Sequence, residues 1–325
     1  MKKRVLVTGA AGFIGAHLMS RLVSSNFEVI GIDNFSDYYS KDLKISRMKA
    51  FGIGNFIQDV NLIDFEKISK VFEAFQPTDL IHLAAQPGVR YSRVNPNSYI
   101  VNNIVAFENL IKACTLFHVP RLLYASSSSV YGKTSNKAFI ESDRGGEVKN
   151  LYALSKRFNE DRAVLELPAI ESVGMRFFSV YGPWGRPDMA YFRVIGSALG
   201  LWEFRQLGDG EQKRDYTYVD DVVDTLLGLI SSPKLPPFIN IGGGQPISLN
   251  DMKIQVDSFF ESKINVMKIE KDESEAHLTL ADTNLMEKLR LPVPKTTVAE
   301  GLEKVCNWAL TVDRDEYLMW LESSK

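Results

Sequence analysis

The sequence predicts an α/β protein with a doubly wound parallel sheet and a smaller mixed α/β portion. Short apolar runs alternate with longer helix-patterned stretches through the first half of the 325 residues. Glycines at three-residue spacing follow the first apolar run, and the second run ends in an acidic residue. Short apolar strands between helices are typical of a parallel sheet that is covered on both faces.

The candidate strands are short apolar runs, and helix patterns such as Ile14–Ser24 and Asn103–Phe117 lie between them. These strands are Arg4–Val7, Glu28–Ile32, Asn55–Ile57, Asp79–Leu83, Arg121–Ser126, Ser172–Phe177 and Phe238–Ile241. Beyond Tyr181 the alternation loosens into mixed loops and helices. We therefore expect a first domain over residues 1–180, with a return strand near residues 238–242, and a second portion over residues 181–325 that interleaves with it.

Composition excludes several classes of protein. The 38 basic and 40 acidic residues nearly balance, whereas a nucleic-acid-binding protein usually has a basic face. No run approaches the roughly 20 apolar residues of a membrane span, and Thr8-Gly9 interrupts the first apolar run too early for a signal peptide. Cys114 and Cys306 match neither a metal site nor a disulfide framework. We expect a cytoplasmic protein with no metal, nucleic-acid or membrane partner.

The glycine-rich stretch after the first strand predicts a site for a dinucleotide. Gly9 permits a tight turn, Gly12 lets the backbone approach a pyrophosphate at a helix N-terminus, and Gly15 lets the helix pack closely on the strand. Asp33 ends the second strand, where a carboxylate accepts from ribose hydroxyls and repels a 2′-phosphate, which favours NAD over NADP. The alternative is a structural turn with a chance acidic residue. The expected cofactor contacts here are Gly9, Gly12, Phe13, Ile14, Gly15, Asp33 and Asn34.

The stretch Thr8-Gly-x-x-Gly-Phe-Ile-Gly resembles the start of the extended short-chain dehydrogenase/reductase family, whose fold is Rossmann-type. Further matches follow in the family's order. Asp59-Val60 resembles its adenine-contacting pair, His82–Ala85 resembles the loop beside the cofactor ribose, and Asn103 resembles the helix residue near it. The resemblance therefore implies that the first domain binds NAD, with further contacts from Asp59, Val60, Ala84, Ala85, Gln86 and Asn103.

Tyr152 and Lys156 lie four residues apart and hence on one helix face. A lysine ammonium, together with the positive nicotinamide ring, is expected to lower the pKa of the phenol, so that the phenolate takes a proton from a sugar hydroxyl while hydride passes to NAD. The alternative is a half-buried tyrosine beside a solvated lysine. Many family members have proline before this tyrosine, and Leu151 is expected to alter only the entry of the helix.

The serine-rich run Ser126–Ser129 should lie at the carboxyl end of a strand, where ligands bind in open α/β sheets. By the resemblance, the Ser127 hydroxyl bonds the reacting sugar oxygen and shares its proton with Tyr152. The alternative is a polar strand end with no chemistry. Related 4,6-dehydratases carry an Asp-Glu pair where this chain has Ser128 and Ser129, and hydroxyls do not readily eliminate water. The dehydratase reading is therefore disfavoured.

Residues 84–92 and 175–190 look very like the same segments of UDP-glucuronate 4-epimerases, as does Asp33–Tyr39. The resemblance places Ser128, Ser129, Ser179 and Arg186 around a hexuronate carboxylate, for which a guanidinium and hydroxyls are suitable donors. Arg186 beside two prolines has the alternative of an ordinary loop arginine. By the same resemblance, Arg90 contacts the sugar or the UDP phosphates and Arg214 grips the diphosphate, whereas Asp220 and Asp221 are expected to cap the following helix.

One stretch departs from the family. Lys271–His277 is acidic where relatives have a turn of more basic character, and this acidity is unfavourable for holding a diphosphate. The expected reaction is still NAD-dependent inversion at carbon 4 of a UDP-hexuronate through a 4-keto intermediate. The alternatives are a 4-epimerase of a neutral UDP-hexose or UDP-N-acetylhexosamine, a nucleotide-sugar dehydratase or reductase, and a non-catalytic NAD-sensing regulator. Family members commonly dimerise through two helices, here those beginning near Asn103 and Tyr152, so a homodimer is expected.

Overall fold

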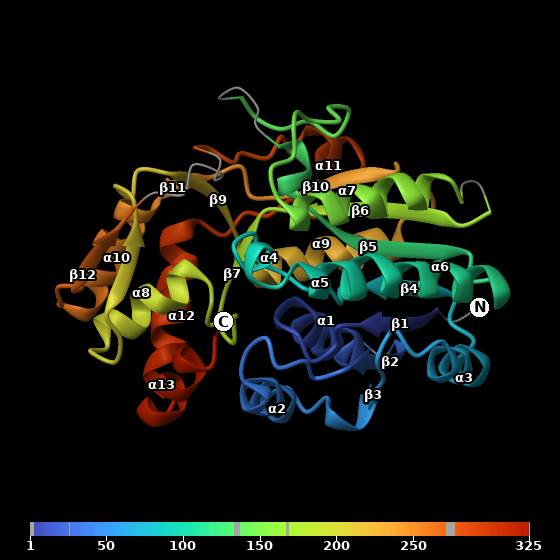
Figure 1. Cartoon of the computed structure of the whole chain (residues 1–325), viewed down its shortest axis with the longest axis horizontal. Coiled ribbons are helices and arrows are strands. Elements are labelled where there is room, and N and C mark those ends of the chain that lie inside the picture. The colour runs from blue at the N-terminus through green and yellow to red at the C-terminus, as the bar shows by residue number, and fades with distance from the viewer. Residues whose placement is uncertain (1–2, 26, 133–136, 167–168, 271–276, 325) are drawn as a thin grey trace.

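A sheet of seven parallel strands, in the order β10-β6-β5-β4-β1-β2-β3, forms the larger part of the molecule (Figure 1). The computed structural model describes residues 3–25, 27–132, 137–166, 169–270 and 277–324. The strands are β1 Arg4–Thr8, β2 Glu28–Asp33, β3 Ile57–Asp59, β4 Asp79–His82, β5 Arg121–Ser127, β6 Glu171–Phe177 and β10 Phe238–Ile241. The order runs outward from β1 in both directions, which confirms the predicted doubly wound α/β fold.

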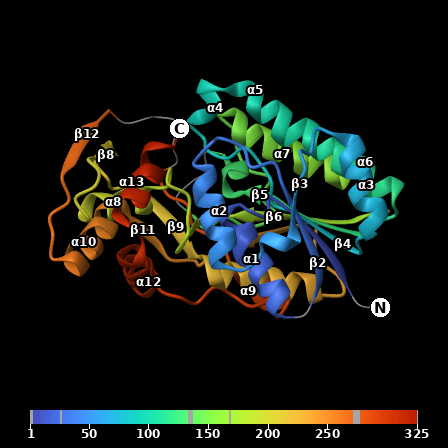
Figure 2. The same ribbon diagram turned by 90° about the horizontal axis from the view of Figure 1, so that it is seen from below.

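Helices cover both faces of this sheet (Figure 2). Val5 and Val7 of β1 pack with helices α1 (Phe13–Ser24) and α9 (Val219–Ser231), whereas Leu6 between them packs with α3 (Phe65–Phe75) and α6 (Ala106–Leu116). Helix α7 (Leu151–Val164) packs against β5 and β6. Successive side chains of a strand point to opposite faces, so continuous apolar runs are the pattern that a doubly covered sheet requires.

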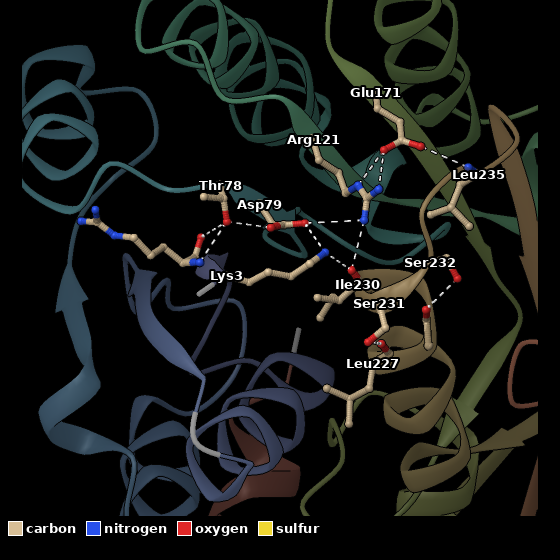
Figure 3. Close-up of polar contacts among 12 residues, drawn as sticks. Lys3, Thr78, Asp79, Arg121, Glu171, Leu227, Ile230, Ser231, Ser232 and Leu235 are labelled. Carbon is tan, nitrogen blue, oxygen red and sulfur yellow. Dashed lines mark hydrogen bonds and ion pairs between the residues drawn. The ribbon is translucent and has the colours of Figure 1, made fainter. Parts of the chain in front are cut away.

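Ion pairs and hydrogen bonds hold together the starts of the central strands (Figure 3). Arg121 pairs with Glu171 at 2.6 Å and lies 3.8 Å from Asp79, so the entries of β4, β5 and β6 are linked. Arg121 also donates to Ile230 O at the end of α9, and Leu235 N donates to Glu171. These contacts lie at the amino ends of the strands, which leaves the carboxyl ends, where glycine turns and serines gather, for ligands.

Apart from α9 and β10, which belong to the large sheet and its layers, the described residues of the second portion form two small sheets and four longer helices around an aromatic core. The sheets are β11-β9-β7 (β7 Ser179–Tyr181, β9 Lys213–Tyr218, β11 Pro246–Ser248) and β12-β8 (β8 Phe204–Leu207, β12 Val266–Ile269). The helices are α8 Ala190–Ala198, α10 Leu249–Phe260, α12 Val298–Thr311 and α13 Arg314–Glu322. Trp184, Phe192, Trp308, Tyr317 and Trp320 form linked ring contacts in this core. Shorter elements are α2 Lys41–Ala50, α4 Tyr91–Val94, α5 Pro96–Tyr99 and α11 Asn284–Lys288.

Some predicted boundaries are wrong. The third strand starts at Ile57 rather than Asn55, because Gly54–Phe56 form a 3₁₀ turn (η1). The helix predicted from Asn103 is an α-helix only from Ala106, since Ile100–Val105 form a π-helical segment (η2) that continues into it.

The predicted capping of α9 is also wrong. Its N-cap is Tyr218, which makes no side-chain cap, and Asp220 and Asp221 lie in the first turn. Asp221 instead accepts hydrogen bonds from Lys295 N (3.1 Å) and Thr296 N (2.8 Å), so it holds the segment that leads into α12. Among the described residues, no helix combines the length and apolar character that crossing a membrane requires.

Candidate active site

A cavity of about 400 Å³ opens at the carboxyl ends of the central strands. Residues after β1, β2, β4 and β5 line it, together with α7 and the segment after β6. A second cavity of about 330 Å³ adjoins it over the second portion of the chain. The residues common to both linings are Tyr38, Gly88, Val89, Ser179, Arg186 and Met189. The two cavities are therefore neighbours, separated only by residues that line both.

The glycine turn after β1 leaves no room for side chains. Gly9 has a φ of +69°, and a Cβ there would lie 2.7 Å from Ala84 N. A Cβ on Gly15 would lie 2.1 Å from Gly9 O, which confirms that α1 packs closely on the turn. Gly12 is the N-cap of α1 and supplies no side-chain cap, so the first turn of the helix keeps backbone donors for an anion. The turn fits the pyrophosphate of a dinucleotide.

Asp33 lines the larger cavity and also fixes the glycine turn. Its carboxylate accepts from Ala11 N at 3.1 Å and from Phe35 N at 2.8 Å. Lys44, which the sequence analysis missed, is buried in the same lining with its Nζ 3.8 Å from Asp33. In the sequence, the only sign that Lys44 lies near the site is its position on α2, the helix that follows β2. This ammonium offsets part of the negative charge of the Asp33 carboxylate, on which the predicted preference for NAD over NADP depends.

Most other predicted cofactor residues lie in this lining, and two do not. Phe13, Ile14, Asn34, Val60, Ala84, Ala85 and Gln86 line the larger cavity. Asp59 is exposed at the end of β3 and lies outside the lining. Asn103 is buried outside the lining, where its side chain accepts from Gln86 N (2.7 Å) and donates to Gln86 O (3.1 Å) and Ser155 Oγ (3.0 Å). Asn103 thus holds the loop that lines the cavity.

Tyr152, Lys156 and Ser127 are brought together in the lining of the same cavity. Lys156 is buried and donates to Ala125 O at 2.8 Å, and this burial lowers its pKa to about 8. Burial raises the pKa of Tyr152, whereas the Ser127 hydroxyl and the Arg186 guanidinium act in the opposite direction. In the chain itself, Lys156 directs its ammonium to Ala125 O, and the positive charge that favours the Tyr152 phenolate comes from Arg186. The effect of Lys156 and bound nicotinamide on this phenol stays a prediction.

Helix α7 begins at Leu151, so the residue that replaces proline occupies its first position. Asn150 is the N-cap, and its side chain accepts from Ala153 N at 2.8 Å. An asparagine at this position stabilises a helix start without proline. Tyr152 therefore sits in a well-formed first turn.

The serines at the end of β5 and directly after it place several hydroxyls close together beside Tyr152. The short helix η3 (Ser128–Tyr131) follows the strand, and Ser127 Oγ both accepts from Ser129 N and donates to Ser129 Oγ, each at 3.1 Å. Ser128, Ser129 and Ser179 line the larger cavity. Hydroxyls at this place can donate to oxygens of a ligand.

Arg186 lines both cavities and is held by an acidic partner. Its Nε and Nη2 donate to the two carboxylate oxygens of Asp188 at 3.0 and 2.9 Å, and Tyr38 OH donates to the same carboxylate at 3.1 Å. Such a half-buried, oriented guanidinium differs from the alternative of an ordinary loop arginine. Sequence reasoning missed Asp188 and Tyr38, although both lie in segments that resemble the family.

The second cavity is rich in positive charge. Its lining contains the five arginines Arg90, Arg186, Arg193, Arg205 and Arg214, and Asp188 is its single carboxylate among the described residues. Arg214, predicted to grip a diphosphate, donates to Lys213 O and Gln212 Oε1 at 3.1 and 3.2 Å. Residues 271–276 of the acidic stretch lie outside the described residues, whereas His277 O accepts from Lys213 N at 3.0 Å. This cavity suits a ligand with several negative charges.

The fold and these cavities define a dinucleotide-dependent enzyme with an adjoining site for an anionic substrate. A match to the family described as the NAD dependent epimerase/dehydratase family covers residues 5–242, and the chain belongs to this family.

Its relatives and structural neighbours include UDP-sugar epimerases. UDP-glucuronate 4-epimerase 3 of Arabidopsis thaliana is 35% identical over 94% of this chain and 76% of that protein. Protein CapI of Staphylococcus aureus is 37% identical over 94% of this chain and 98% of that protein. The crystal structure of UDP-glucuronic acid 4-epimerase from Bacillus cereus with UDP-glucuronic acid and NAD has a TM-score of 0.86, with 30% identity over 94% of this chain and 98% of that one.

Proposed function

We propose that this protein is an NAD-dependent 4-epimerase that converts UDP-glucuronate into UDP-galacturonate. The observation that carries the proposal is the half-buried guanidinium of Arg186, which lines the cavity that contains Tyr152 and the serine hydroxyls. A guanidinium with hydroxyl donors beside the reacting centre suits a sugar carboxylate. The similarity to the Bacillus and Arabidopsis enzymes supports the same substrate.

Charge supports a hexuronate as well. Five arginines and one aspartate line the second cavity. The diphosphate of a UDP-sugar and the carboxylate of a hexuronate together balance this positive charge better than a neutral sugar nucleotide does. We propose that Arg90 and Arg214 bind the diphosphate and that Ser128, Ser129, Ser179 and Arg186 surround the carboxylate.

The cofactor contacts follow from the lining of the larger cavity. We propose that the glycine turn holds the NAD pyrophosphate, that Asp33 binds the adenosine ribose, and that Val60 and residues 84–86 border the rest of the cofactor. When bound, NAD accepts hydride from carbon 4 of the sugar and later returns it. By this assignment, residues 1–180 with β10 bind NAD, and residues 181–325 supply much of the substrate site.

In the reaction, Tyr152 takes the proton of the hydroxyl on carbon 4 while Ser127 holds that oxygen. Burial raises the pKa of Tyr152, so the positive charge of Arg186 and the Ser127 hydroxyl are needed to favour the phenolate. Lys156, with a pKa lowered to about 8, sits on the same helix face and exchanges protons readily near neutral pH. The 4-keto sugar turns over while the arginines retain the diphosphate, and Tyr152 returns the proton after hydride addition to the opposite face.

A neutral UDP-hexose is a second candidate substrate, because Asp188 already neutralises Arg186 through two hydrogen bonds. Incubating the purified protein with UDP-glucuronate, UDP-glucose or UDP-N-acetylglucosamine and separating the products distinguishes these possibilities. We expect UDP-galacturonate from UDP-glucuronate without added NAD, and NAD among the small molecules released on denaturation. If UDP-glucuronate is recovered unchanged while UDP-glucose is epimerised, the hexuronate assignment is wrong.

We also propose a homodimer formed by α7 and by the helix that runs through η2 into α6. Large apolar side chains on these elements are exposed, including Leu154 (51%), Phe158 (37%), Val105 (43%) and Leu116 (56%). An exposed apolar group on neighbouring helices is typical of a protein interface. Leu154→Glu should convert the dimer into a monomer in sedimentation velocity, whereas Ile254→Glu, at an exposed position on α10, should leave it unchanged.

We further propose a cytoplasmic location. The two thiols, Cys114 and Cys306, are both buried and free. Proteins of reducing compartments keep their thiols in this form.

A further inference from the structure

Arg47 on α2 is a fully buried cation that donates its hydrogen bonds to uncharged acceptors. Its side chain is 0% exposed. Nε and Nη2 donate to Trp184 O at 2.9 and 2.7 Å, and Nη2 also donates to Gly185 O at 3.3 Å. Nη1 donates to Ala11 O at 2.7 Å and to Tyr39 OH at 3.2 Å. Three carbonyls and one phenol therefore accept hydrogen bonds from the guanidinium without neutralising its charge, although a buried charge is normally paired.

One end of this fork holds the cofactor turn. Ala11 lies between Gly9 and Gly12, and its N–H is held by Asp33 while its carbonyl is held by Arg47. A pyrophosphate at the N-terminus of α1 brings negative charge next to this turn. In the proposed function, the NAD pyrophosphate therefore binds at a turn whose Ala11 carbonyl is held by the buried guanidinium.

The other end of the fork holds the turn that carries Arg186. Trp184 has a φ of 59°, a left-handed conformation that a bulky residue adopts only when its surroundings hold it there. Gly185 is equally confined, since a Cβ there would lie 1.5 Å from Tyr191 OH. Arg47 binds the carbonyls of both residues, and the next residue in the chain is Arg186. The placement of the carboxylate-binding guanidinium therefore depends on Arg47.

We propose that Arg47 is a positioning residue that couples NAD binding to the placement of Arg186, so that bound NAD strengthens recognition of the sugar carboxylate. The pyrophosphate stabilises the charge of Arg47 and the glycine turn, and the same guanidinium fixes the turn at Trp184. Because such coupling is reciprocal, a carboxylate-bearing substrate also slows the loss of NAD. This inference rests on the proposed function and assigns a role to a residue that need touch neither ligand.

The test measures substrate affinity with and without NAD in a Tyr152→Phe background, which prevents turnover. Calorimetry gives the dissociation constants of UDP-glucuronate and of UDP-xylose, its analogue without the carboxylate, for NAD-loaded and NAD-stripped protein. With Arg47 present, we expect NAD to strengthen binding of UDP-glucuronate about tenfold more than binding of UDP-xylose, which corresponds to about 1.4 kcal/mol. Arg47→Gln should remove this difference while UDP-xylose binding changes little.

Two further variants make the result decisive. Arg47→Lys keeps the charge but cannot bridge both turns, so it should also lose the NAD-dependent preference, and it serves if Arg47→Gln does not fold. Arg21→Gln is the matched control, because Arg21 pairs with Asp224 at a half-exposed site on α1 and should leave the preference intact. The inference is overturned if the preference persists in Arg47→Gln or Arg47→Lys, or if NAD strengthens both ligands equally in the parent. Failure of the parent to bind NAD or UDP-glucuronate instead rejects the proposed function.

Discussion

Replacing Arg186 with methionine tests the substrate assignment directly. Two donors of this guanidinium engage Asp188 at 3.0 and 2.9 Å, so its remaining edge is available to a sugar carboxylate. A hydrogen bond to a charged group contributes about 1.5–3 kcal/mol. Since about 1.4 kcal/mol corresponds to a factor of ten, loss of one such bond should weaken the binding of UDP-glucuronate by about 10- to 150-fold.

The assay needs a ligand that lacks the carboxylate, and UDP-xylose provides it. Calorimetry in a Tyr152→Phe background, which prevents turnover, gives the dissociation constants of both UDP-glucuronate and UDP-xylose, so that any effect of Arg186 on Tyr152 does not enter the comparison. Arg186→Met leaves the Asp188 carboxylate without its partner, which affects both ligands, so the ratio of the two effects is the quantity to compare. Adding Asp188→Asn removes that leftover charge and should preserve the altered ratio. Equal losses for UDP-glucuronate and UDP-xylose would show that Arg186 does not recognise the carboxylate.

Three other substitutions follow from the site. Tyr152→Phe should reduce kcat by at least about 1,000-fold while NAD and UDP-glucuronate still bind, because only the proton-accepting group is removed; retention of more than a tenth of the activity contradicts its role as the base. Gly15→Ala should abolish NAD retention, since its Cβ would lie 2.1 Å from Gly9 O, whereas Gly54→Ala, with no atom within 4 Å of its Cβ, should retain NAD; equal retention in both contradicts the packing argument. Burial lowers the pKa of Lys156 from 10.5 to about 8, so the folded chain binds fewer protons than the unfolded chain between these values, and stability contributed through Lys156 rises with pH in that window. Urea unfolding of the parent and of Lys156→Met at several pH values should show the free energy of unfolding of the parent rising relative to that of the variant between pH 8 and 10.5. A constant offset between the two free energies would refute the sign.

The fold was largely predictable from the sequence because its signals are local. Apolar runs mark the strands, and the glycine turn with Asp33 marks the proposed cofactor site in the lining of the larger cavity. The predicted starts of β3 and α6 were wrong because the local geometry there is unusual. Gly54–Phe56 form a 3₁₀ turn, and Ile100–Val105 form a π-helical segment.

The site was only partly predictable. Tyr152 and Lys156 could be predicted from their four-residue spacing and Ser127 from the family resemblance, and all three lie in the lining of the larger cavity. Arg47 could not, since its partner Trp184 lies 137 positions away and no pattern near Arg47 indicates that contact. The environment of Lys156 also escaped sequence reasoning, because its bond to Ala125 O depends on how α7 packs on β5.

The return of the chain as β10 has a consequence for synthesis. This edge strand pairs with β6 along Gly174–Phe177, yet more than sixty positions separate the end of β6 from Phe238. During translation, the backbone groups of β6 that pair with β10 in the folded protein stay unpaired until the residues of β10 emerge from the ribosome. A fragment ending near residue 180 keeps that edge exposed permanently, so it should self-associate through β6 rather than accumulate as a stable nucleotide-binding unit.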